Sequence, residues 1–207
     1  MLIIEGPDLV GKTALAKRLE ARHEFQDRGM IYRHLSRLPP GFDTPWQYRS
    51  LMGRRTIYDR FHVSEPAYCY ARGEASSQLS PEKVRLLDGW LRGLGAFTVL
   101  ITADDDLLRE RHAKRAADEM YPVETVLRAN EAFRWMGNVW VNGPMEPTCI
   151  DERYRFDFDV WLHCTADRPW PSSEQWIDNI VDRYLERQAV LEHVLDSADE
   201  AADYGVR

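Results

Sequence analysis

The feature that most constrains this chain is the segment IIEGPDLVGKT at residues 3–13. Gly6 and Gly11 enclose four residues, and Lys12 and Thr13 follow directly, which gives the spacing GxxxxGK[ST] of a phosphate-binding loop. The glycines let backbone N–H groups turn toward an anion, and the N-terminus of a following helix adds positive potential. Because such a loop needs a strand before it and a helix after it, the segment predicts the start of a parallel α/β sheet.

Short apolar segments alternate with helical patterns along the rest of the chain. We predict strands near residues 1–5, 29–35, 54–61, 97–102 and 156–164. We predict helices near residues 11–23, 80–94 and 173–191, and two charged helices within residues 104–136 that are broken at Tyr121 and Pro122. The predicted fold class is therefore α/β, a P-loop NTPase fold with about five parallel strands, helices on both faces and a small helical lid.

The chain of 207 residues is long enough for one well-buried core, so we predict a single domain over residues 1–207. The lid is expected at about residues 104–122. Prolines and a glycine in residues 138–156 break the alternation of strands and helices, so we expect a hairpin or an irregular insertion there. The tail at about residues 196–207 is acidic and has little to bury, and we expect it to fray.

The charge and the cysteines argue against several classes of protein. A net charge of −7 argues against broad binding to duplex nucleic acid, although it leaves room for a locally basic pocket. No apolar run approaches the roughly 20 residues that a membrane-spanning helix needs. The first residues resemble a strand and not a signal peptide. Cys69, Cys149 and Cys164 are far apart and odd in number, so we expect free thiols in a reduced, cytoplasmic protein.

A second group of polar residues follows the third predicted strand, in YDRFHVSEPAYCYARG at residues 58–73. Asp59 ends that strand at the carboxyl edge of the sheet, where α/β folds bind their ligands. A carboxylate there can hold the magnesium shell or orient a hydroxyl group. Arg60 beside it offers a fixed fork of donors to a phosphate. Taken alone, such a pair is more often a structural ion pair, so its functional interpretation depends on the phosphate-binding loop.

The phosphate-binding loop has a defined chemistry of its own. Lys12 would reach the β- and γ-phosphates of a nucleotide, and the Thr13 hydroxyl would ligate Mg²⁺. A nucleotide and Mg²⁺ are therefore the predicted ligands, and the loop alone leaves a GTPase, an ATPase, a kinase and a helicase open; ATP as the cofactor follows from the resemblance described next. The candidate nucleotide-binding residues are Gly6, Asp8, Gly11, Lys12, Thr13 and Ala14, and the candidate metal ligands are Thr13 and Asp59.

The two motifs together resemble the thymidylate kinase family. EGPDLVGKT is similar to that family's opening EGxDGxGK[ST], and DRFHVSEPAYCYARG is similar to its segment DR[YFW]xxSxxAYQ. The stretch LLRERHAKRAADEMYPVETVLRANEAF at residues 107–133 is similar to its arginine-rich lid and the helix after it. The resemblance covers residues 1–136, and beyond them only a strand and a closing helix match.

The resemblance implies a reaction and roles for individual residues. The γ-phosphoryl group of ATP would pass to the 5′-phosphate of a deoxynucleoside monophosphate, with a pyrimidine as the favoured base. Arg60 would hold the acceptor phosphate, and Asp59 would lie near magnesium. Asp8 would approach the sugar 3′-hydroxyl, and Tyr68 would crowd the 2′ position and so favour deoxyribose. The acceptor is thus expected to be a small-molecule nucleotide.

The resemblance also implies a catalytic arginine, which family members carry either just after the loop aspartate or in the lid. Leu9 follows Asp8 here, so the lid should supply it, with Arg111 and Arg115 as candidates. An arginine delivered there would neutralise charge that the loose transition state spreads over three oxygens. Alternatively, arginines four residues apart among glutamates form a solvated helix face.

Several positions depart from the family pattern. Leu9 and Val10 replace a small, glycine-containing pair, and Cys69 replaces a glutamine. Glu65 replaces a neutral residue; it could accept a hydrogen bond from a base or from a modified pyrimidine, or face solvent at the start of a helix. The family's acceptor loop is only weakly matched. The candidate acceptor-binding residues are Asp8, Arg37, Phe42, Arg49, Arg60, Ser64, Glu65 and Tyr68.

Three alternatives stay open. A deoxynucleoside kinase would act on a free 5′-hydroxyl and often carries Glu-Arg-Ser where this chain has Asp-Arg-Phe. A second kind of kinase would phosphorylate a hydroxymethylated pyrimidine, as a nucleotide or within DNA. A regulatory protein would bind nucleotide without turnover, although the loop, acid, arginine and lid argue against it. Exposed tryptophans around residues 135–140 could form the face of a homodimer, because the family often dimerises.

Overall fold

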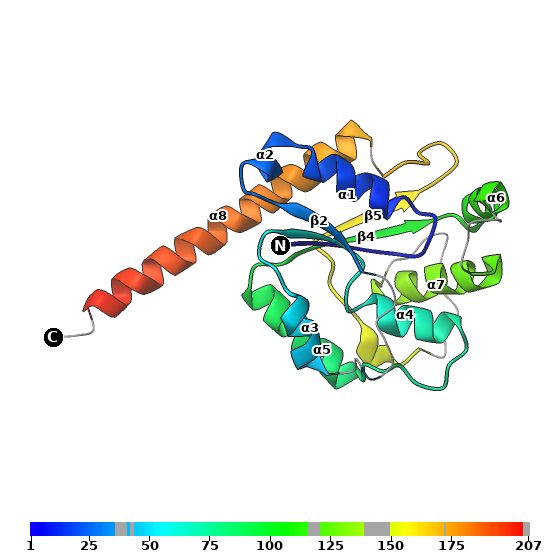
Figure 1. The fold of residues 1–207 in the computed structure, drawn as a ribbon, viewed down its shortest axis with the longest axis horizontal. Coiled ribbons are helices and arrows are strands. Elements are labelled where there is room, and N and C mark those ends of the chain that lie inside the picture. Colours follow the sequence, from blue (N-terminus) through cyan, green and yellow to red (C-terminus); the bar gives the residue numbers. More distant parts are fainter. Residues whose placement is uncertain (36–40, 42–43, 116–120, 139–149, 172, 205–207) are drawn as a thin grey trace.

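The computed structural model describes the chain except for residues 36–40, 42–43, 116–120, 139–149, 172 and 205–207, and only the backbone of residues 194–204. Five parallel strands form a sheet in the order β2-β3-β1-β4-β5 (Figure 1). They are β1 (Leu2–Glu5), β2 (Ile31–His34), β3 (Thr56–Asp59), β4 (Phe97–Ala103) and β5 (Val160–Cys164). The predicted α/β class with a parallel sheet is confirmed.

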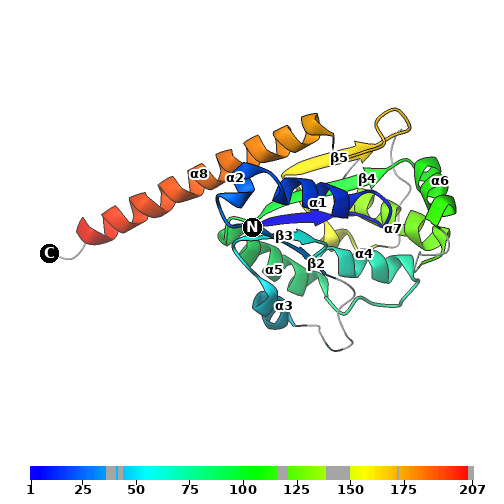
Figure 2. The same cartoon turned by 45° about the horizontal axis from the view of Figure 1, so that its top comes forward.

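Helices cover both faces of the sheet, as Figures 1 and 2 show. One face carries α1 (Lys12–Glu20), α2 (His23–Gln26) and α8 (Glu174–Tyr204). The other carries α3 (Pro45–Leu51), α4 (Ser64–Ala71), α5 (Pro81–Gly93) and α7 (Val123–Met136). The helix α6 (Asp105–Arg115) follows β4 directly and lies beyond its carboxyl end.

The sheet separates two apolar clusters, and strand β1 contributes to both. Leu2 and Ile4 pack with the helices α1 and α8, whereas Ile3 packs with the cluster of α4, α5 and α7. This division follows from the alternation of side chains along a strand. All four residues of β1 are buried, because helices cover it on both sides. Its unbroken apolar sequence therefore reflects its central place in the sheet.

Strand β5 starts later than predicted, at Val160 instead of residue 156. The carboxylate of Asp159 explains the difference. It accepts hydrogen bonds from the backbone N–H of Thr98 at 2.7 Å and from the Thr98 hydroxyl at 2.9 Å. The backbone N–H of Thr98 is therefore bonded to a side chain and is not available to the backbone of a further β5 residue. The pairing of β4 with β5 begins at Val99 and Val160.

The last helix is longer than predicted. The pattern predicts an end near residue 191, whereas α8 continues to Tyr204. The fraying of the tail from about residue 196 stays a prediction. Residues 195–204 are mostly alanine, aspartate, glutamate and leucine, and alanine, leucine and glutamate are good helix formers, so local propensity extends the helix. Figure 1 shows the end of α8 extending past the sheet.

The insertion predicted at residues 138–156 is only partly described. Within residues 150–156 the structure has a short 3₁₀ helix, η1 (Glu152–Tyr154), and no strand. Tyr154 is buried and donates a hydrogen bond from its hydroxyl to the carbonyl oxygen of Leu79 at 2.6 Å. The described part therefore packs against the core as an irregular segment.

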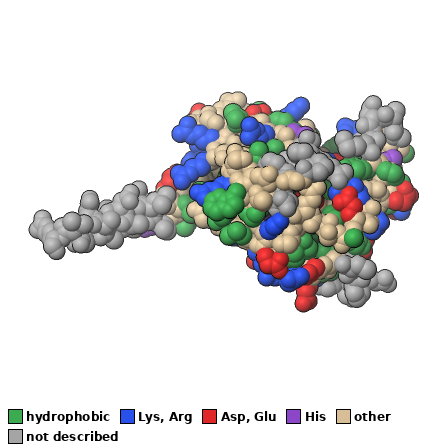
Figure 3. Space-filling view, turned by 60° about the horizontal axis from the view of Figure 1, so that its bottom comes forward, with side chains coloured by type: hydrophobic (Ala, Val, Ile, Leu, Met, Phe, Trp, Pro, Cys, Tyr) green, Lys and Arg blue, Asp and Glu red, His purple; other side chains and the backbone are tan. Residues whose placement is uncertain are grey.

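On the face shown in Figure 3, side chains of both charges are present. The basic and acidic side chains are interspersed over this face. Among the described helices, none is both long and apolar enough to cross a membrane.

Candidate functional site

The loop between β1 and α1 has backbone angles that explain its glycines. Gly6 has φ 145°, and a Cβ there would collide with the carbonyl oxygen of Ile101. Gly11 has φ 94° and packs against the ring of Pro171. Leu9 also has a positive φ, 68°, which is the left-handed region that glycine adopts most readily. Leu9, which departs from the family pattern, therefore occupies a position whose backbone conformation favours glycine.

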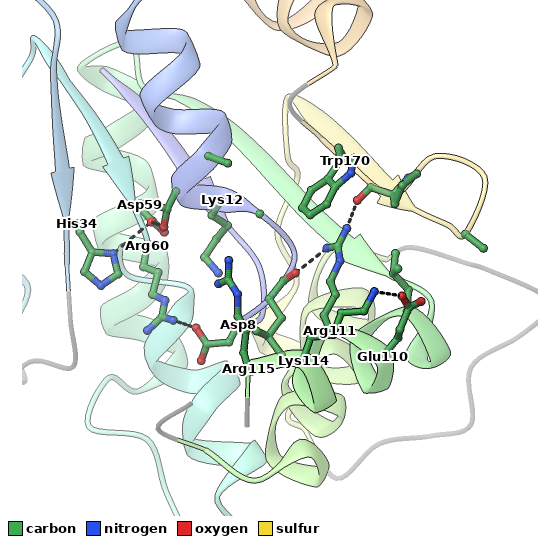
Figure 4. A pocket seen from close by; sticks show the side chains of 17 residues that line it. Asp8, Lys12, His34, Asp59, Arg60, Glu110, Arg111, Lys114, Arg115 and Trp170 are labelled. Carbon is green, nitrogen blue, oxygen red and sulfur yellow. Dashed lines mark hydrogen bonds and ion pairs between the residues drawn. The ribbon is translucent and has the colours of Figure 1, made fainter. Parts of the chain in front are cut away.

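A cavity of about 690 Å³ opens beside this loop at the carboxyl edge of the sheet (Figure 4). Lys12 and Thr13, the first residues of α1, line it together with Asp8 and Ala14. The Lys12 side chain is buried, and its ammonium donates to the carbonyl oxygen of Pro7. The predicted loop residues, except Gly6, therefore line one wall of a shared cavity.

Asp59 ends β3 and is fully buried at the same cavity. Its Oδ2 atom accepts from the Thr13 hydroxyl at 2.5 Å and from the Tyr32 hydroxyl at 3.4 Å, and lies 3.2 Å from Nδ1 of His34. Its Oδ1 atom has no hydrogen-bond partner within the part of the chain that the structure describes. A buried carboxylate oxygen without a partner is costly, so this site suits a ligand that brings a cation or a donor.

The oxygen atoms of Thr13 and Asp59 are the kind of donors that Mg²⁺ prefers. Among the described residues, no group of three or more His, Cys, Asp or Glu side chains could hold a metal alone. Mg²⁺ in nucleotide sites commonly uses one or two protein oxygens together with water and phosphate oxygens. The residues present therefore fit Mg²⁺ that arrives with a nucleotide.

Arg60 follows Asp59 and forms an ion pair with Asp8 across the cavity edge. Its guanidinium also lies over the ring of Tyr68, 5.2 Å from the centroid, and its buried Nε has no partner. The Tyr68 hydroxyl donates to Asp8 at 2.9 Å. Burial raises the pKa of Tyr68, so this hydroxyl keeps its proton. Three of the predicted acceptor residues thus form one hydrogen-bonded group.

Glu5, at the end of β1, fixes the turn that carries Arg60. Its fully buried carboxyl group accepts from the backbone N–H groups of Phe61 and Val63 at 3.0 and 3.1 Å and from the Ser64 hydroxyl at 2.5 Å. Burial raises the pKa of Glu5, and these donors oppose that shift. Ser64, predicted to bind the acceptor, is therefore engaged in holding the turn.

The two lid arginines on α6 differ sharply. Arg111 is buried, and its Nη1 and Nη2 atoms donate to the carbonyl oxygens of Leu9, at 2.6 Å, and Pro169. Burial lowers the pKa of its guanidinium. Arg115 is exposed, lines the cavity and has no hydrogen bond or ion pair among the described residues. Figure 4 shows its side chain extending from the end of α6 into the cavity.

Two further predicted acceptor residues, Glu65 and Arg49, do not line this cavity. Glu65 is half-buried and accepts from the backbone N–H of Gln78 at 3.4 Å, so it does not simply face solvent. The guanidinium of Arg49 lies 5.4 Å from the ring centroids of both Trp46 and Trp90, on α3 and α5. Arg37 and Phe42 lie outside the described residues.

Two tryptophans predicted near a dimer face need separate comment. Trp135 is buried in the core and packs under the guanidinium of Arg155, so it does not form an exposed face. Trp140 lies outside the described residues. Trp135 therefore does not contribute to such a face, because α7 turns that side chain inward, and the homodimer stays a prediction.

Sequence reasoning missed several residues that line the cavity, among them His34 and Trp170. His34 ends β2 at the same sheet edge as Asp59, so the rule that selected Asp59 could have selected it as well. Trp170 is 57% exposed, and the guanidinium of Arg111 lies 4.6 Å from its ring centroid. No local pattern in the sequence indicates where the segment after β5 turns, so the place of Trp170 could not be predicted.

Charge favours an anionic ligand. Lys12, Arg60, Arg111, Lys114 and Arg115 line the cavity with Asp8, Asp59 and Glu110. The five basic side chains outnumber the three acidic ones, which leaves a formal excess of two positive charges in the cavity lining. The chain has a net charge of −7, so the positive potential is local to this site.

Comparisons with known proteins support the fold and go no further. No protein-family model matches the chain, and no curated protein sequence matches it. Among solved structures, it is similar to the YorR protein of Bacillus subtilis, whose structure was determined in complex with phosphorylated GDP. The two chains share 19% identity with a TM-score of 0.60, over 90% of this chain and 97% of YorR. At that identity the similarity shows a common fold.

Proposed function

We propose that the protein transfers the γ-phosphoryl group of ATP to a deoxynucleoside monophosphate, with a pyrimidine as the favoured base. One observation carries this proposal. The loop residues Lys12 and Thr13 and the fork of Arg60 line the same cavity, on either side of the buried Asp59. A donor phosphate chain on the loop and an acceptor phosphate at Arg60 would therefore face each other.

On the donor side, the backbone N–H groups of the loop and the start of α1 receive the phosphates. Lys12 would exchange its contact with Pro7 for the β- and γ-phosphates. Thr13 and Asp59 would hold Mg²⁺, which when bound neutralises charge on the phosphate oxygens. The hydrogen bond between these two side chains supports the proposal, because it keeps both oxygens at one point.

On the acceptor side, the guanidinium of Arg60 would release Asp8 and bind the acceptor phosphate in a bidentate manner. Asp8 would then be free to accept a hydrogen bond from the sugar. The ring of Tyr68 packs against the guanidinium of Arg60, and the Tyr68 hydroxyl remains a hydrogen-bond donor. Because the acceptor phosphate is already ionised, this reaction needs no general base.

Arg115 would stabilise the phosphoryl group during transfer. Its guanidinium lines the cavity and is not engaged by any described residue, so it could turn to the phosphoryl group without breaking a contact within the described part of the chain. The charge on the three equatorial oxygens peaks in the transition state, and a planar donor fork suits it. The resemblance to thymidylate kinases supports a lid arginine in this role, and the nucleotide complex of YorR supports a nucleotide ligand in this fold.

The test measures ADP release and product mass with Mg·ATP and one acceptor at a time. The panel contains the four common deoxynucleoside monophosphates, 5-hydroxymethyl-dUMP, the matching nucleosides, GMP, GDP and DNA that contains hydroxymethyluracil. A diphosphate formed from one pyrimidine monophosphate, and lost with Arg60→Ala, is expected. Binding of ATP without product from any acceptor would contradict a kinase and support a regulatory protein.

A second candidate is a kinase that acts on a hydroxyl group, of a nucleoside or of a modified pyrimidine. It is favoured by Oδ1 of Asp59, which has no partner among the described residues, and by His34, whose Nδ1 lies 3.2 Å from the other oxygen, Oδ2, at the same cavity. A hydroxyl acceptor needs a base, and a buried carboxylate with a free oxygen could serve. Phosphate appearing only on a nucleoside or on the modified DNA would establish this alternative.

A further inference from the structure

Arg111 joins three segments that are far apart in the sequence. It projects from α6, donates to Leu9 in the loop after β1 and to Pro169 after β5, and lies over the ring of Trp170. The side chain is 9% exposed, and no carboxylate pairs with it among the described residues. Its guanidinium N–H groups therefore donate to backbone carbonyl groups and connect the segments that carry them (Figure 4).

Arg111 contacts Leu9, a residue whose backbone conformation is strained. Leu9 holds φ 68°, a conformation that costs a residue with a Cβ more than it costs glycine. Rotation of this residue toward an ordinary conformation would turn its carbonyl away and displace the neighbouring N–H groups. Those N–H groups are the part of the loop that would contact phosphate. A donor on the Leu9 carbonyl holds the residue in the strained conformation.

We propose that Arg111 is a positioning residue that keeps the phosphate-binding loop in its binding conformation, a task made necessary by leucine at position 9. The proposal rests on the proposed function only in assuming that the loop binds nucleotide phosphates. It separates the two lid arginines, because Arg111 acts through the loop whereas Arg115 would touch the transferred group. It also implies that the part of α6 up to Arg111 stays in place against the loop.

The prediction concerns binding of Mg·ADP, measured by calorimetry on the full-length protein. Arg111→Lys keeps the charge but cannot reach two carbonyl groups with a planar fork, and it should weaken binding about tenfold or more. Leu9→Gly alone should change binding less than about threefold, because glycine adopts the conformation freely. In the double variant, Leu9→Gly should restore most of the affinity that Arg111→Lys loses.

Two further variants sharpen the result. Arg109→Lys is the matched control, because Arg109 is an exposed arginine on the same helix that does not line the cavity. Leu9→Val keeps Arg111 but introduces a β-branched residue that fits a positive φ poorly, so binding should weaken. This variant tests the strain even if Arg111→Lys does not fold.

Steady-state kinetics separate positioning from catalysis. A brace on the donor loop should raise the KM for ATP about tenfold in Arg111→Lys while kcat falls less and the acceptor KM stays unchanged. Equal losses in the single and double Arg111→Lys variants, or full affinity in Arg111→Lys and Leu9→Val, would overturn the proposal. Failure of the wild-type protein to bind Mg·ADP would instead overturn the proposed function, so the two failures are distinguishable.

Discussion

At the scale of single residues, the site contains two kinds of polar side chain. In one kind the polar atoms have hydrogen-bond partners within the protein, and in the other kind some polar atoms have none among the described residues. Glu5 has partners on both oxygens, whereas Asp59 has one oxygen without any. Arg111 has two carbonyl partners, whereas Arg115 has none among the described residues. The first member of each pair builds the site, and the second is available to a ligand.

Arg115→Lys should lower kcat by about 100- to 1,000-fold, the range seen when one transition-state donor is removed. The KM values should change less than about threefold, because the interaction forms mainly during transfer. ADP release at saturating ATP and acceptor gives the measurement, with Arg109→Lys as the control. A change confined to KM would assign Arg115 to substrate binding.

The carboxyl group of Glu5 should make stability depend on pH. Burial raises its pKa in the folded state above the ordinary value of 4.5, so the folded state holds this proton more tightly. The stabilisation is present below pH 4.5 and is lost as the pH rises toward the folded-state pKa, with a slope of up to about 1.4 kcal/mol per pH unit.

Glu5→Gln should remove that slope while keeping the fold. The glutamine oxygen can accept from the N–H groups of Phe61 and Val63, and its amide can donate to Ser64. Urea unfolding between pH 4.5 and pH 8 measures both proteins. Parallel curves would contradict the assignment, and Glu186→Gln, at an exposed position on α8, is the control.

At the scale of elements, the sequence predicts the strands better than the short helices. β1, β3 and β4 are buried along their whole lengths, so each appears as a short segment rich in apolar and β-forming residues. Helix α3 was missed, although Thr44 and Gln47 form a capping box that is readable in the sequence. The start of β5 could not be predicted, because it depends on the contact of Asp159 with Thr98 in another strand.

The anchoring of α8 gives a prediction for an element. Ile180 is fully buried against the sheet, whereas Val190 on the same helix is 63% exposed. Ile180→Ala should therefore reduce the free energy of unfolding by about 2–5 kcal/mol, through lost burial and a cavity. Val190→Ala should change it by less than about 0.5 kcal/mol. Similar effects of the two substitutions in urea unfolding would mean that α8 is not anchored as described.

At the scale of the whole molecule, the cavity is assembled from parts that lie far apart in the chain. The loop at residues 8–14, the ends of β2 and β3, helix α6 and the segment at residues 166–170 all line it. The loop, Asp59 and Arg60 could be predicted, because a motif or the end of a strand marks them. Trp170 and the separate places of Arg111 and Arg115 could not, because they depend on how distant segments meet.

A cavity built from distant segments should link ligand binding to global stability. If Mg·ATP binds only the folded protein, then ATP at 100 times its Kd should raise the free energy of unfolding by about 2.7 kcal/mol. Without Mg²⁺ the buried carboxylate of Asp59 would face the phosphates with no cation between them, so EDTA should remove much of the gain.

Thr13→Val provides the matched variant, because valine has nearly the shape of threonine and position 13 is exposed, which leaves the fold intact. Its stabilisation by ATP should be small and nearly the same with Mg²⁺ and with EDTA, since the hydroxyl that would ligate the metal is gone. Thermal unfolding at fixed ATP concentration measures all four combinations. Equal stabilisation of the wild-type protein with Mg²⁺ and with EDTA would show that Thr13 and Asp59 do not form a metal site, and Asp59 would then be left as a candidate base for a hydroxyl acceptor.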